Sequence, residues 1–450
     1  MKIAFITLGC KLNYAETSTW ERGFAEAGLE VVPWREKADI YLVNTCSVTA
    51  TSDAKSRSEI RKVHRINPAA SIIVTGCSAQ LRRSEIEAIE GVTRVFGAAE
   101  KAQVVPEILR LLPAGTCSAG TYHPRIDSGG TVEDGGVSEA NSLSCRYLPA
   151  AGGGSEAEEE MFAAYSSGER TRSFLKVQDG CDNLCAYCTV PYARGHSRNI
   201  PISKAVELAR EIAAKGIREV VLTGVNTGDF GRSTGESFLN LLKALEQVDG
   251  IERWRISSIE PNLLSEEIVD WIASGTKFMP HFHIPLQSGC DRILSQMGRR
   301  YDTSFFAGRI DYIRRAMEGP GKLKVFFGID TMVGLPGESD EDFRTTCDFI
   351  RHIHPAFIHV FPYSRRPGTP AAEMPGQVSE ARKHERVKEL EELCSDLHTQ
   401  FTEANRGLRA RVLFESREKD GTMSGYTENY IRITRPWDPA KAGAIVEETI

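Results

Sequence analysis

The sequence lacks a long apolar run and lacks an excess of basic residues. No uncharged stretch approaches the roughly 18 apolar residues that a membrane-spanning helix needs. Its 55 lysine and arginine residues stand against 61 acidic residues, which gives a net charge of −6. These absences argue against a transmembrane protein and against a wholly basic nucleic-acid-binding protein, although a local basic surface is compatible with an acidic total.

The amino terminus also lacks the features of a secretion signal. Only about six apolar residues precede Cys10, whereas the apolar region of a signal peptide spans roughly 7 to 15 residues. We therefore expect a cytoplasmic protein with no membrane association. The 11 cysteines then favour metal ligation or catalysis over disulfides, because that compartment keeps thiols reduced.

Length and hydrophobic patterning predict three domains and a connection between the first two. With 450 residues, 41% of them hydrophobic, the chain is long enough for several cores. Residues 1–112 alternate between short apolar runs and helical stretches, which predicts a small parallel sheet flanked by helices. Residues 113–170 are rich in Gly, Ser, Glu and Ala, so we interpret them as a linker or insertion that carries Cys117 and Cys145 as free thiols.

The central residues 171–400 repeat a strand-and-helix pattern six times, and a β-rich tail follows at residues 401–450. Six such units predict an α/β fold with a partial (β/α)6 barrel of the TIM type, whose chemistry lies at the carboxyl ends of the strands. A charged, leucine-spaced segment at 379–405 predicts a long helix that packs on this barrel. The tail predicts a small β-barrel, although it is short after Ile433 for a complete one. The six expected strands lie at 174–177, 220–223, 253–257, 281–286, 324–330 and 357–361.

A cysteine motif directly follows the first expected barrel strand. Cys181, Cys185 and Cys188 have the spacing CxxxCxxC, so three thiolates on one tight loop can hold three irons of a 4Fe-4S cluster and leave the fourth iron without a protein ligand. A zinc site and buried structural cysteines are the alternatives, but structural zinc prefers four protein ligands. We favour the cluster because the motif coincides with the catalytic end of the expected barrel.

Three more cysteines follow the strands expected in the first domain. Cys10 (TLGCKLN), Cys46 (NTCSVTA) and Cys77 (TGCSAQ) would therefore meet at one edge of a parallel sheet, where such sheets bind ligands. Coincidence is the alternative, since cysteine is often buried. The same three-thiolate arrangement nevertheless predicts a second cluster with an open iron.

The CxxxCxxC motif, with Tyr187 before its last cysteine, resembles that of the radical S-adenosylmethionine (SAM) enzymes. In that superfamily the open iron binds the amino and carboxylate groups of SAM. The segments GVNTGDFG, LQSG and GLPGES end expected strands and resemble cofactor-contacting loops, whereas His281 and His283 are more typical of satisfied strand histidines. The resemblance implies that the cofactor contacts are Tyr187, Gly224, Asn226, Gly228, Gln287, Ser288, Gly334, Pro336, Gly337 and Glu338.

Both cysteine triads together resemble the methylthiotransferases over nearly the whole chain. That family combines a cluster domain, a radical SAM domain and a small RNA-binding β-barrel called a TRAM domain. The resemblance implies two 4Fe-4S clusters, one that generates a 5′-deoxyadenosyl radical and one implicated in supplying sulfur, with SAM also as the methyl donor. It further implies a low-potential electron donor such as flavodoxin or ferredoxin. We assign no ligand role to Cys290, Cys347 or Cys394.

Three substrates divide this family: isopentenyladenosine in tRNA, threonylcarbamoyladenosine in tRNA, and an aspartate of a ribosomal protein. The segments VPYARGHSRN and GYTENYIRI resemble most closely the threonylcarbamoyladenosine group, whose target is position 37 beside the anticodon. The expected partner is then the anticodon stem-loop of a tRNA. An iron-sulfur RNA-binding protein without turnover is the alternative of another class. Groups that suit RNA phosphates are Arg409, Arg411, Arg432 and Arg435, with an ordinary mixed-charge β surface as the alternative. Groups that could pair with the carboxylate of the modified base are Arg194, Arg198, Arg365 and Arg366, although solvated surface arginine is the commoner fate.

Overall fold

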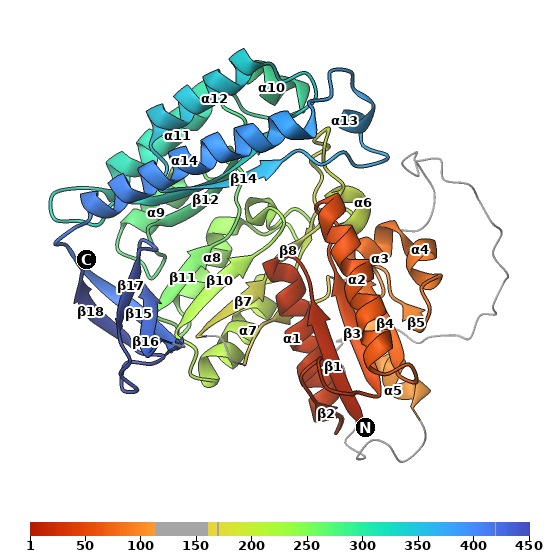
Figure 1. Cartoon of the computed structure of the whole chain (residues 1–450). Helices are drawn as coiled ribbons and strands as arrows, with labels where there is room; N and C mark the ends of the chain where they lie inside the picture. The colour runs from red at the N-terminus through yellow and green to blue at the C-terminus, as the bar shows by residue number, and fades with distance from the viewer. Residues whose placement is uncertain (113–160, 169–170, 419) are drawn as a thin grey trace.

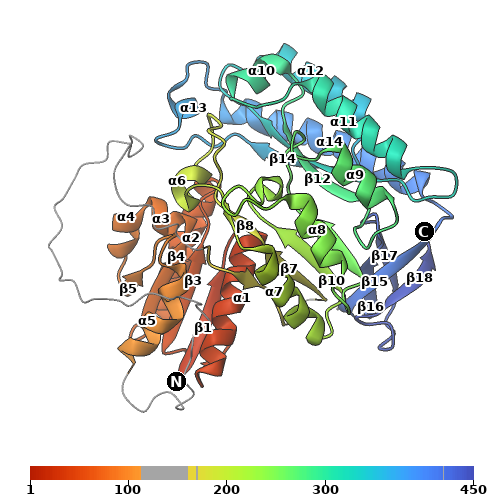
Figure 2. The same ribbon diagram turned by 180° about the vertical axis from the view of Figure 1, so that it is seen from behind.

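The computed structural model describes residues 1–112, 161–168, 171–418 and 420–450 as three bodies side by side (Figure 1). A parallel sheet with helices on both faces forms the amino-terminal body, an open barrel forms the centre, and an antiparallel sheet forms the carboxyl-terminal body. The view from behind shows the first and last bodies on opposite flanks of the barrel (Figure 2). The predicted α/β fold is thus confirmed. Across the described residues, no helix has both the length and the apolar character to cross a membrane.

The amino-terminal body is a parallel sheet between two helical layers. Its elements are β1 (Lys2–Thr7), α1 (Lys11–Glu26), β2 (Glu30–Val31), β3 (Ile40–Thr45), α2 (Ala50–Ile66), β4 (Ser71–Gly76), α3 (Cys77–Leu81), α4 (Arg83–Glu87), β5 (Val92–Val95) and α5 (Val104–Leu111). The strand order is β2-β1-β3-β4-β5, and the central strand β3 is buried along its whole length. Helices α1 and α5 cover one face, and α2 and α4 cover the other. Burial on both faces is what a parallel sheet requires, and the predicted small parallel sheet is confirmed.

The centre is a barrel of six parallel strands that stays open. Its elements are β7 (Arg172–Lys176), β8 (Gln178–Asp179), α6 (Val190–Arg194), β9 (Arg198–Asn199), α7 (Ile202–Ala214), β10 (Glu219–Thr223), α8 (Phe238–Glu246), β11 (Arg253–Ile256), α9 (Glu266–Ala273), β12 (His281–Gln287), α10 (Asp291–Gln296), α11 (Thr303–Met317), β13 (Phe326–Val333), α12 (Asp340–Ile353) and β14 (Phe357–Pro362). Strands β7, β10 and β11 form one ladder and β12, β13 and β14 form another, joined by the isolated bridges Trp254–Phe278 and Ser258–His283. In the described part of the chain, no ladder joins β14 back to β7. The six predicted strands are present, which confirms the partial barrel.

A short strand ties the amino-terminal body to the barrel. Strand β6 (Ala164–Tyr165) pairs antiparallel with β7, and the ring of Phe162 stacks on Trp20 of α1 with centroids 5.6 Å apart. These residues belong to the segment interpreted as a linker, whose composition gave no indication of a strand. Two residues of that segment, Cys117 and Cys145, lie outside the described residues.

The carboxyl-terminal body is a long helix followed by an antiparallel sheet. After β14 come α13 (Pro370–Glu373), α14 (Glu380–Ala404), β15 (Arg409–Arg417), β16 (Thr422–Tyr426), β17 (Arg432–Pro436) and β18 (Ile445–Thr449). Helix α14 packs on β14 through the core of the barrel, as predicted. The sheet has the order β17-β16-β15-β18 and forms a half-barrel, so the expected β-rich domain is confirmed, and the tail that looked short still provides β18.

The half-barrel contacts the amino-terminal ends of the barrel strands. Arg253 and Arg255 of β11 donate to the backbone carbonyl of Thr427 at 2.7 and 2.8 Å. The ring of Tyr430 lies 4.6 Å from that of His281, the first residue of β12. The cysteine motif follows the other end of the strands, so the half-barrel lies away from it along the barrel.

Candidate functional site

The CxxxCxxC loop lies between β8 and α6, at the carboxyl end of the first barrel strand. Cys181 and Cys185 are buried, and Cys188 is half-buried. The backbone N–H groups of Asn183 and Val190 donate to the Sγ atoms of Cys181 and Cys188, both at 3.4 Å. The structure therefore brings the three predicted ligands together on one loop, and the loop itself supplies hydrogen bonds to their sulfur atoms.

This set of donors suits a metal centre better than it suits free thiols. Burial raises the pKa of Cys181 to about 11 and that of Cys188 to about 12, so both stay protonated near neutral pH when no metal is bound. A metal ion displaces the thiol proton outright, and N–H groups directed at sulfur favour the thiolate that results. The loop thus fits the predicted three-cysteine cluster.

An arginine that the sequence motifs did not indicate contacts this loop. The guanidinium of Arg299, which follows α10, donates to Cys185 Sγ at 3.1 Å and to the Tyr187 hydroxyl at 3.4 Å. Its Nη2 atom donates to both carboxylate oxygens of Glu260, at 2.7 and 2.6 Å. The side chain of Arg299 is only 4% exposed, so these contacts form away from bulk water. Glu260 lies shortly after the end of β11. A charged residue at a strand end of the barrel is the sequence feature from which this ion pair could have been predicted.

The predicted cofactor residues after β10 are packed against their own protein. The Asn226 backbone N–H donates to Gln178 Oε1 at 2.9 Å, and its side-chain amide donates within the same loop. A Cβ at Gly224 would come within 2.8 Å of Gln178 Oε1, and one at Gly228 within 2.6 Å of Leu263 Cβ. These two glycines therefore let the loop pack closely against Gln178 and Leu263 of the same protein. Their contact with a cofactor stays a prediction.

The end of β12 holds a strained backbone. Gln287 has a φ of +66°, in the left-handed region that residues with a Cβ rarely adopt. The pairing of β12 with β13 shifts its register between Pro285 and Gln287, and such a bulge re-aims side chains at a strand end. Ser288 is buried, and its hydroxyl accepts from the Cys290 N–H at 3.2 Å. The cofactor role of Gln287 and Ser288 stays a prediction.

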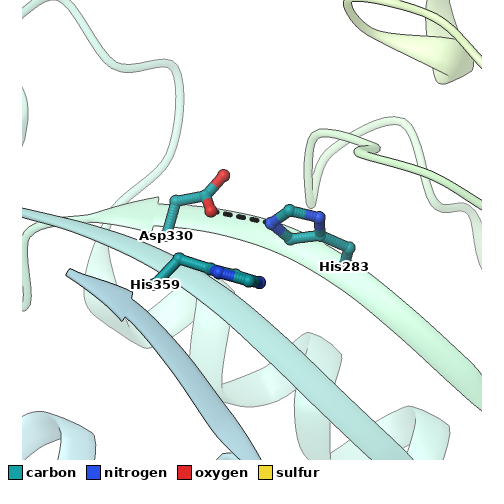
Figure 3. A group of neighbouring side chains, drawn as sticks. All are labelled: His283, Asp330 and His359. Carbon is teal, nitrogen blue, oxygen red and sulfur yellow. Dashed lines mark hydrogen bonds and ion pairs between the residues drawn. The ribbon is translucent and has the colours of Figure 1, made fainter. Parts of the chain in front are cut away.

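The two histidines of β12 have different surroundings. The ring of His281 stacks with that of Phe326 and lies tilted against that of Tyr430. Burial lowers the pKa of His281, and its Nδ1 atom has no hydrogen-bond partner among the described residues. His283 Nε2 lies 2.7 Å from Asp330 Oδ1 on β13, and His359 on β14 lies beside this pair (Figure 3). The prediction of satisfied strand histidines thus holds for His283, while His281 is held by ring contacts.

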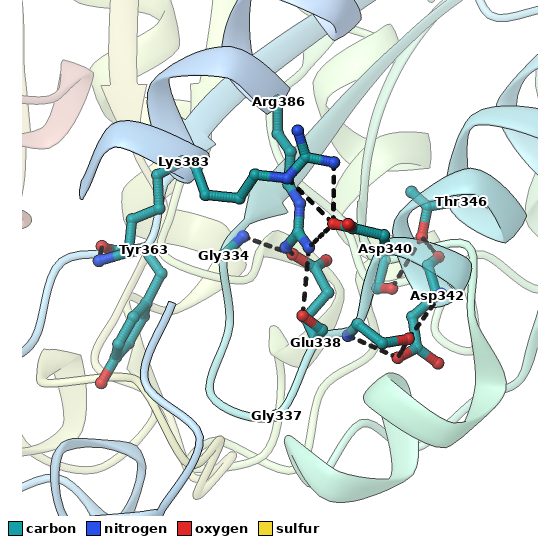
Figure 4. A network of polar contacts seen from close by, with 12 residues as sticks. Gly334, Gly337, Glu338, Asp340, Asp342, Thr346, Tyr363, Lys383 and Arg386 are labelled. Carbon is teal, nitrogen blue, oxygen red and sulfur yellow. Dashed lines mark hydrogen bonds and ion pairs between the residues drawn. The ribbon is translucent and has the colours of Figure 1, made fainter. Parts of the chain in front are cut away.

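The loop between β13 and α12 is built around a buried carboxylate (Figure 4). Glu338 accepts from the Gly334 N–H at 2.5 Å and from Arg386 of α14 at 2.6 Å. Burial raises the pKa of Glu338 to about 7. Gly334 and Gly337 have φ angles of +75° and +74°, which glycine adopts without steric cost, and the Pro336 carbonyl accepts from α10. The four predicted cofactor residues here, Gly334, Pro336, Gly337 and Glu338, lie on one loop, and their contact with a cofactor stays a prediction.

The second cysteine triad is assembled from three strand ends. Cys10 follows β1 at the start of α1, Cys46 follows β3, and Cys77 follows β4 as the first residue of α3. A Cβ at Gly9 would come within 2.8 Å of Cys46 Sγ, so the first two loops touch. Burial raises the pKa of Cys46 and of Cys77, and the charge of Cys10 acts on both. The predicted convergence at one edge of the sheet is what the structure shows.

A buried ion network joins this triad to the barrel. Glu16 of α1 accepts from Lys101 and Lys176 at 2.8 Å each and from Arg194 at 3.2 Å, and Asp179 accepts from Arg194 at 2.8 Å. Burial opposes ionisation of Glu16, but the surrounding cations hold its pKa well below the usual range. All five side chains are at most 3% exposed. Three cations against two carboxylates leave one buried positive charge in excess.

Arg194 connects the two cysteine sites. It ends α6, directly after the CxxxCxxC loop, and its Nη2 atom donates to Asn13 Oδ1 at 2.6 Å and lies 4.0 Å from Cys10 Sγ. The prediction that Arg194 could pair with a substrate carboxylate is therefore wrong, because the fold brings two carboxylates of its own to this guanidinium.

The other three arginines considered for that carboxylate also have protein partners. Arg366 is 4% exposed and donates to Asp53 of α2 at 2.6 Å, across the junction between the two bodies. Arg198 donates to the backbone carbonyl of Arg194, and Arg365 donates to that of Ala372, both at 2.7 Å. Arg366, like Arg194, therefore serves the domain junction in this structure.

Each arginine predicted to contact RNA forms an ion pair on the half-barrel. The pairs are Arg409–Glu447, Arg411–Glu428, Arg432–Glu418 and Arg435–Glu448. The arginine side chains are between 38% and 76% exposed, and exposed pairs contribute only about 0 to 1 kcal/mol. RNA phosphates can compete for such weakly held guanidinium groups, so the RNA role of these residues stays a prediction.

Two family models match the chain, and it is similar to solved structures as well. The Radical SAM superfamily matches residues 175–350, and Uncharacterized protein family UPF0004 matches residues 2–97. The radical SAM methyltransferase TsrM from Kitasatospora setae, solved with cobalamin and a [4Fe-4S] cluster bound, superposes with a TM-score of 0.54 at 15% identity. The superposition covers 82% of this chain and 77% of that chain. At this identity the likeness shows the fold alone.

Curated relatives align with nearly the whole chain. The threonylcarbamoyladenosine tRNA methylthiotransferase MtaB of Bacillus subtilis is 36% identical over 100% of this chain and 93% of its own length. MtaB of Aquifex aeolicus is 36% identical over 97% of both chains. A tRNA-2-methylthio-N(6)-dimethylallyladenosine synthase of Pelotomaculum thermopropionicum is 32% identical over 100% of this chain and 95% of its own length. With such identities at full length around a radical SAM domain, the chain belongs to the family of radical SAM tRNA methylthiotransferases.

Proposed function

We propose that this chain adds a methylthio group to carbon 2 of N6-threonylcarbamoyladenosine at position 37 of tRNA. The observation that carries the proposal is the presence of two cysteine triads, one at the edge of the amino-terminal sheet and one on the barrel loop that leads into α6. Arg194, the last residue of α6, lies 4.0 Å from Cys10 Sγ. Relatives at 36% identity that are named for this substrate support it. An aromatic C–H bond has no acidic proton for a base, so the reaction needs a radical cofactor.

Cys181, Cys185 and Cys188 would hold one 4Fe-4S cluster with SAM on its open iron. When bound, this group supplies the 5′-deoxyadenosyl radical that opens the adenine C–H bond. The protein's own part is to stabilise thiolates: two loop N–H groups and Arg299 direct hydrogen at the three sulfur atoms.

Cys10, Cys46 and Cys77 would hold a second 4Fe-4S cluster, the one implicated in supplying sulfur. Three thiolates bring negative charge to a partly buried place, since Cys46 is buried, Cys77 is half-buried and Cys10 is exposed. An uncompensated buried charge is costly. The positive charge in excess in the network of Glu16 and Arg194 lies beside Cys10 and offsets it. That charge balance supports an anionic centre at this triad.

The proposed partner is the anticodon stem-loop of a tRNA, whose unpaired bases can be turned out and read. Arg409, Arg411, Arg432 and Arg435 lie on the half-barrel, away from the cysteine loop along the barrel, so they suit phosphates of the stem better than the reacting base. A low-potential donor such as flavodoxin or ferredoxin would deliver the electron for SAM cleavage.

A second candidate substrate is isopentenyladenosine, because a dimethylallyladenosine synthase is 32% identical over the whole chain. Mass spectrometry of tRNA nucleosides from a strain that lacks the gene tests both. Methylthio-threonylcarbamoyladenosine should disappear and return with the wild-type gene or with Cys347→Ala, a buried cysteine of α12 outside both triads, but not with Cys181→Ala. Loss of methylthio-isopentenyladenosine instead would transfer the chain to the sister specificity. Loss of neither would leave a ribosomal-protein aspartate, or an RNA-binding protein without turnover.

A further inference from the structure

The barrel interior holds three polar side chains that neither cysteine site uses. His283, Asp330 and His359 lie on the adjacent strands β12, β13 and β14, and their side chains come together (Figure 3). One nitrogen or oxygen atom from each lies within 4.8 Å of the others. Ile284 and Ile329, which alternate with them, are fully buried in the core under the helices. Because successive side chains of a strand point to opposite faces, this trio faces the inside of the barrel.

The register of the sheet brings the trio together. Asp330 pairs directly with His359 in the ladder of β13 and β14, and His283 pairs with Gly328, two residues before Asp330. Neighbouring strands lie about 4.8 Å apart, so paired residues on one face bring their side chains into contact. Gly328 has no side chain, and a Cβ there would meet its nearest atom, Phe326 Cε1, only at 3.4 Å. Close packing therefore does not require this glycine, which leaves room over β13 between the two histidine strands.

The trio has unused capacity to bind a ligand. His283 Nε2 lies 2.7 Å from Asp330 Oδ1, but Asp330 Oδ2 has no hydrogen-bond partner within the ranges that the structure describes. His359 contacts the rings of His283 and Phe357 and, among the same residues, forms no hydrogen bond. The side chains of His283 and Asp330 are 18% and 19% exposed, and His359 is exposed. One carboxylate oxygen and one imidazole therefore remain open to a ligand, and an ion can reach them from solvent.

The surroundings of His283 are those of a metal ligand. Its Nδ1 atom lies 3.5 Å from the hydroxyl of Ser258, the residue with which His283 forms an isolated bridge. This contact directs Nε2 toward Asp330. Histidine ligands of metals are commonly oriented in this way, through a hydrogen bond of the other ring nitrogen. All three side chains of the trio also stand on strands, which hold a set of ligands more precisely than loops do.

We propose that His283, Asp330 and His359 form a binding site for one divalent transition-metal ion such as Zn²⁺. Two imidazoles and one carboxylate are ligands that such ions accept. Three protein ligands leave at least one coordination position open, as in catalytic rather than structural zinc sites. That position faces the barrel interior, where water or an oxygen atom of a bound substrate can occupy it. The site shares no residue with either cysteine triad and goes beyond the proposed function.

The hydrogen bond between His283 and Asp330 belongs to the metal-free site. Ligand atoms around a tetrahedral zinc ion lie about 3.3 Å from one another, because each is about 2.0 to 2.2 Å from the metal. The 2.7 Å between Nε2 and Oδ1 therefore has to lengthen slightly, which side-chain torsions permit without movement of the strands. The ion then displaces the proton that these two atoms share, since metal ligands must be deprotonated. A hydrogen-bonded pair beside an unrelated histidine is the competing interpretation, and it predicts no bound ion.

Zinc binding to the holoenzyme tests the proposal, because sites of this kind bind Zn²⁺ more tightly than Fe²⁺. Protein with its clusters loaded is equilibrated with Zn²⁺ without oxygen, desalted, and analysed for zinc and iron. The wild type should retain about one zinc per chain on this ligand arithmetic. Loss of an outer hydrogen-bond partner already costs a metal site about 10- to 100-fold in affinity, so His359→Gln and Asp330→Asn, which remove a ligand, should each weaken zinc binding by about 100-fold or more.

Matched variants and the zinc absorption spectrum separate this site from the cysteines. His352→Gln and Asp348→Asn change exposed residues of α12 and should keep the zinc binding of the wild type. X-ray absorption of the wild type should show nitrogen and oxygen at about 2.0 to 2.2 Å from zinc and no sulfur at about 2.3 Å. Should Asp330→Asn lose iron, His359→Gln, a change at an exposed residue, carries the comparison. Zinc held through sulfur, or equal zinc binding in the wild type and in iron-loaded His359→Gln, overturns the inference.

Discussion

The two cysteine sites differ in how the chain builds them. The CxxxCxxC site takes its thiols from residues 181–188, and N–H groups of the same loop donate to their sulfur atoms. The other site takes Cys10, Cys46 and Cys77 from three strand ends and has Arg194 of the barrel at its border. The first site is thus a property of one loop, and the second is a property of a folded sheet docked on a barrel. A substitution at the domain junction should therefore disturb the site of Cys10, Cys46 and Cys77 more than the CxxxCxxC site.

The largest expected effect comes from exchanging each triad for alanine. Reconstituted wild type should bind about eight irons, and either triple variant about four, because each triad would hold one 4Fe-4S cluster. Reductive cleavage of SAM should persist without Cys10, Cys46 and Cys77 and vanish without the CxxxCxxC triad. Iron analysis and assay of 5′-deoxyadenosine check this. Iron near zero in one triple variant would show that the two sites do not form independently.

A smaller and more selective effect is expected of Arg194→Gln. Removal of one partner of a buried ion pair destabilises a protein by about 3 to 5 kcal/mol. In the variant that keeps only the amino-terminal triad, Arg194→Gln should lower the iron content; in the variant that keeps only CxxxCxxC, iron should persist. Thermal unfolding and iron analysis measure both. Arg351→Gln, which breaks an exposed pair with Asp348, is the control and should cost only about 0 to 1 kcal/mol.

Arg299→Gln should change the properties of the CxxxCxxC cluster without loss of its iron. The change removes a charged donor to Cys185 Sγ, so the cluster should become harder to reduce and its potential more negative. Hydrogen bonds to charged groups are worth about 1.5 to 3 kcal/mol, which corresponds to SAM cleavage slower by about 10- to 150-fold. Redox titration and single-turnover kinetics measure this. The exposed neighbour Arg300→Gln should match the wild type, and an Arg299→Gln variant with unchanged potential would contradict a role for this hydrogen bond.

The smallest effect on either site is expected from the half-barrel. Replacing Arg409, Arg411, Arg432 and Arg435 by glutamine should weaken tRNA binding and leave iron and SAM cleavage unchanged. The slope of log affinity against log salt should become shallower by about 0.7 to 0.9 for each phosphate that the variant no longer neutralises. A slope equal to that of the wild type would place the RNA elsewhere on the molecule.

The contrast between the two sites also explains what the sequence could predict. The CxxxCxxC spacing and the six barrel strands are local patterns, so they were predicted. The convergence of Cys10, Cys46 and Cys77 followed from one topological rule, that parallel strands end at a common edge.

What the sequence could not predict were partners brought together by domain docking. The carboxylates of Glu16 and Asp53 come from the amino-terminal body and pair with Arg194 and Arg366 of the barrel. No local pattern specifies such pairs, because their geometry exists only after both domains have folded. Strand β6 was missed for a related reason: two residues that pair with β7 leave no periodic signal.

The positive φ of Gln287 is expected to lower the stability of the fold at a residue that is predicted to contact the cofactor. A residue with a Cβ in that conformation stores about 1 to 3 kcal/mol, whereas glycine adopts it freely. Gln287→Gly should therefore release this strain, less about 0.4 to 1 kcal/mol for the greater freedom of glycine in the unfolded chain. If Gln287→Gly is more resistant to heat than the wild type and binds SAM more weakly, the strained backbone at this position lowers stability and the side-chain amide of Gln287 serves the binding of SAM.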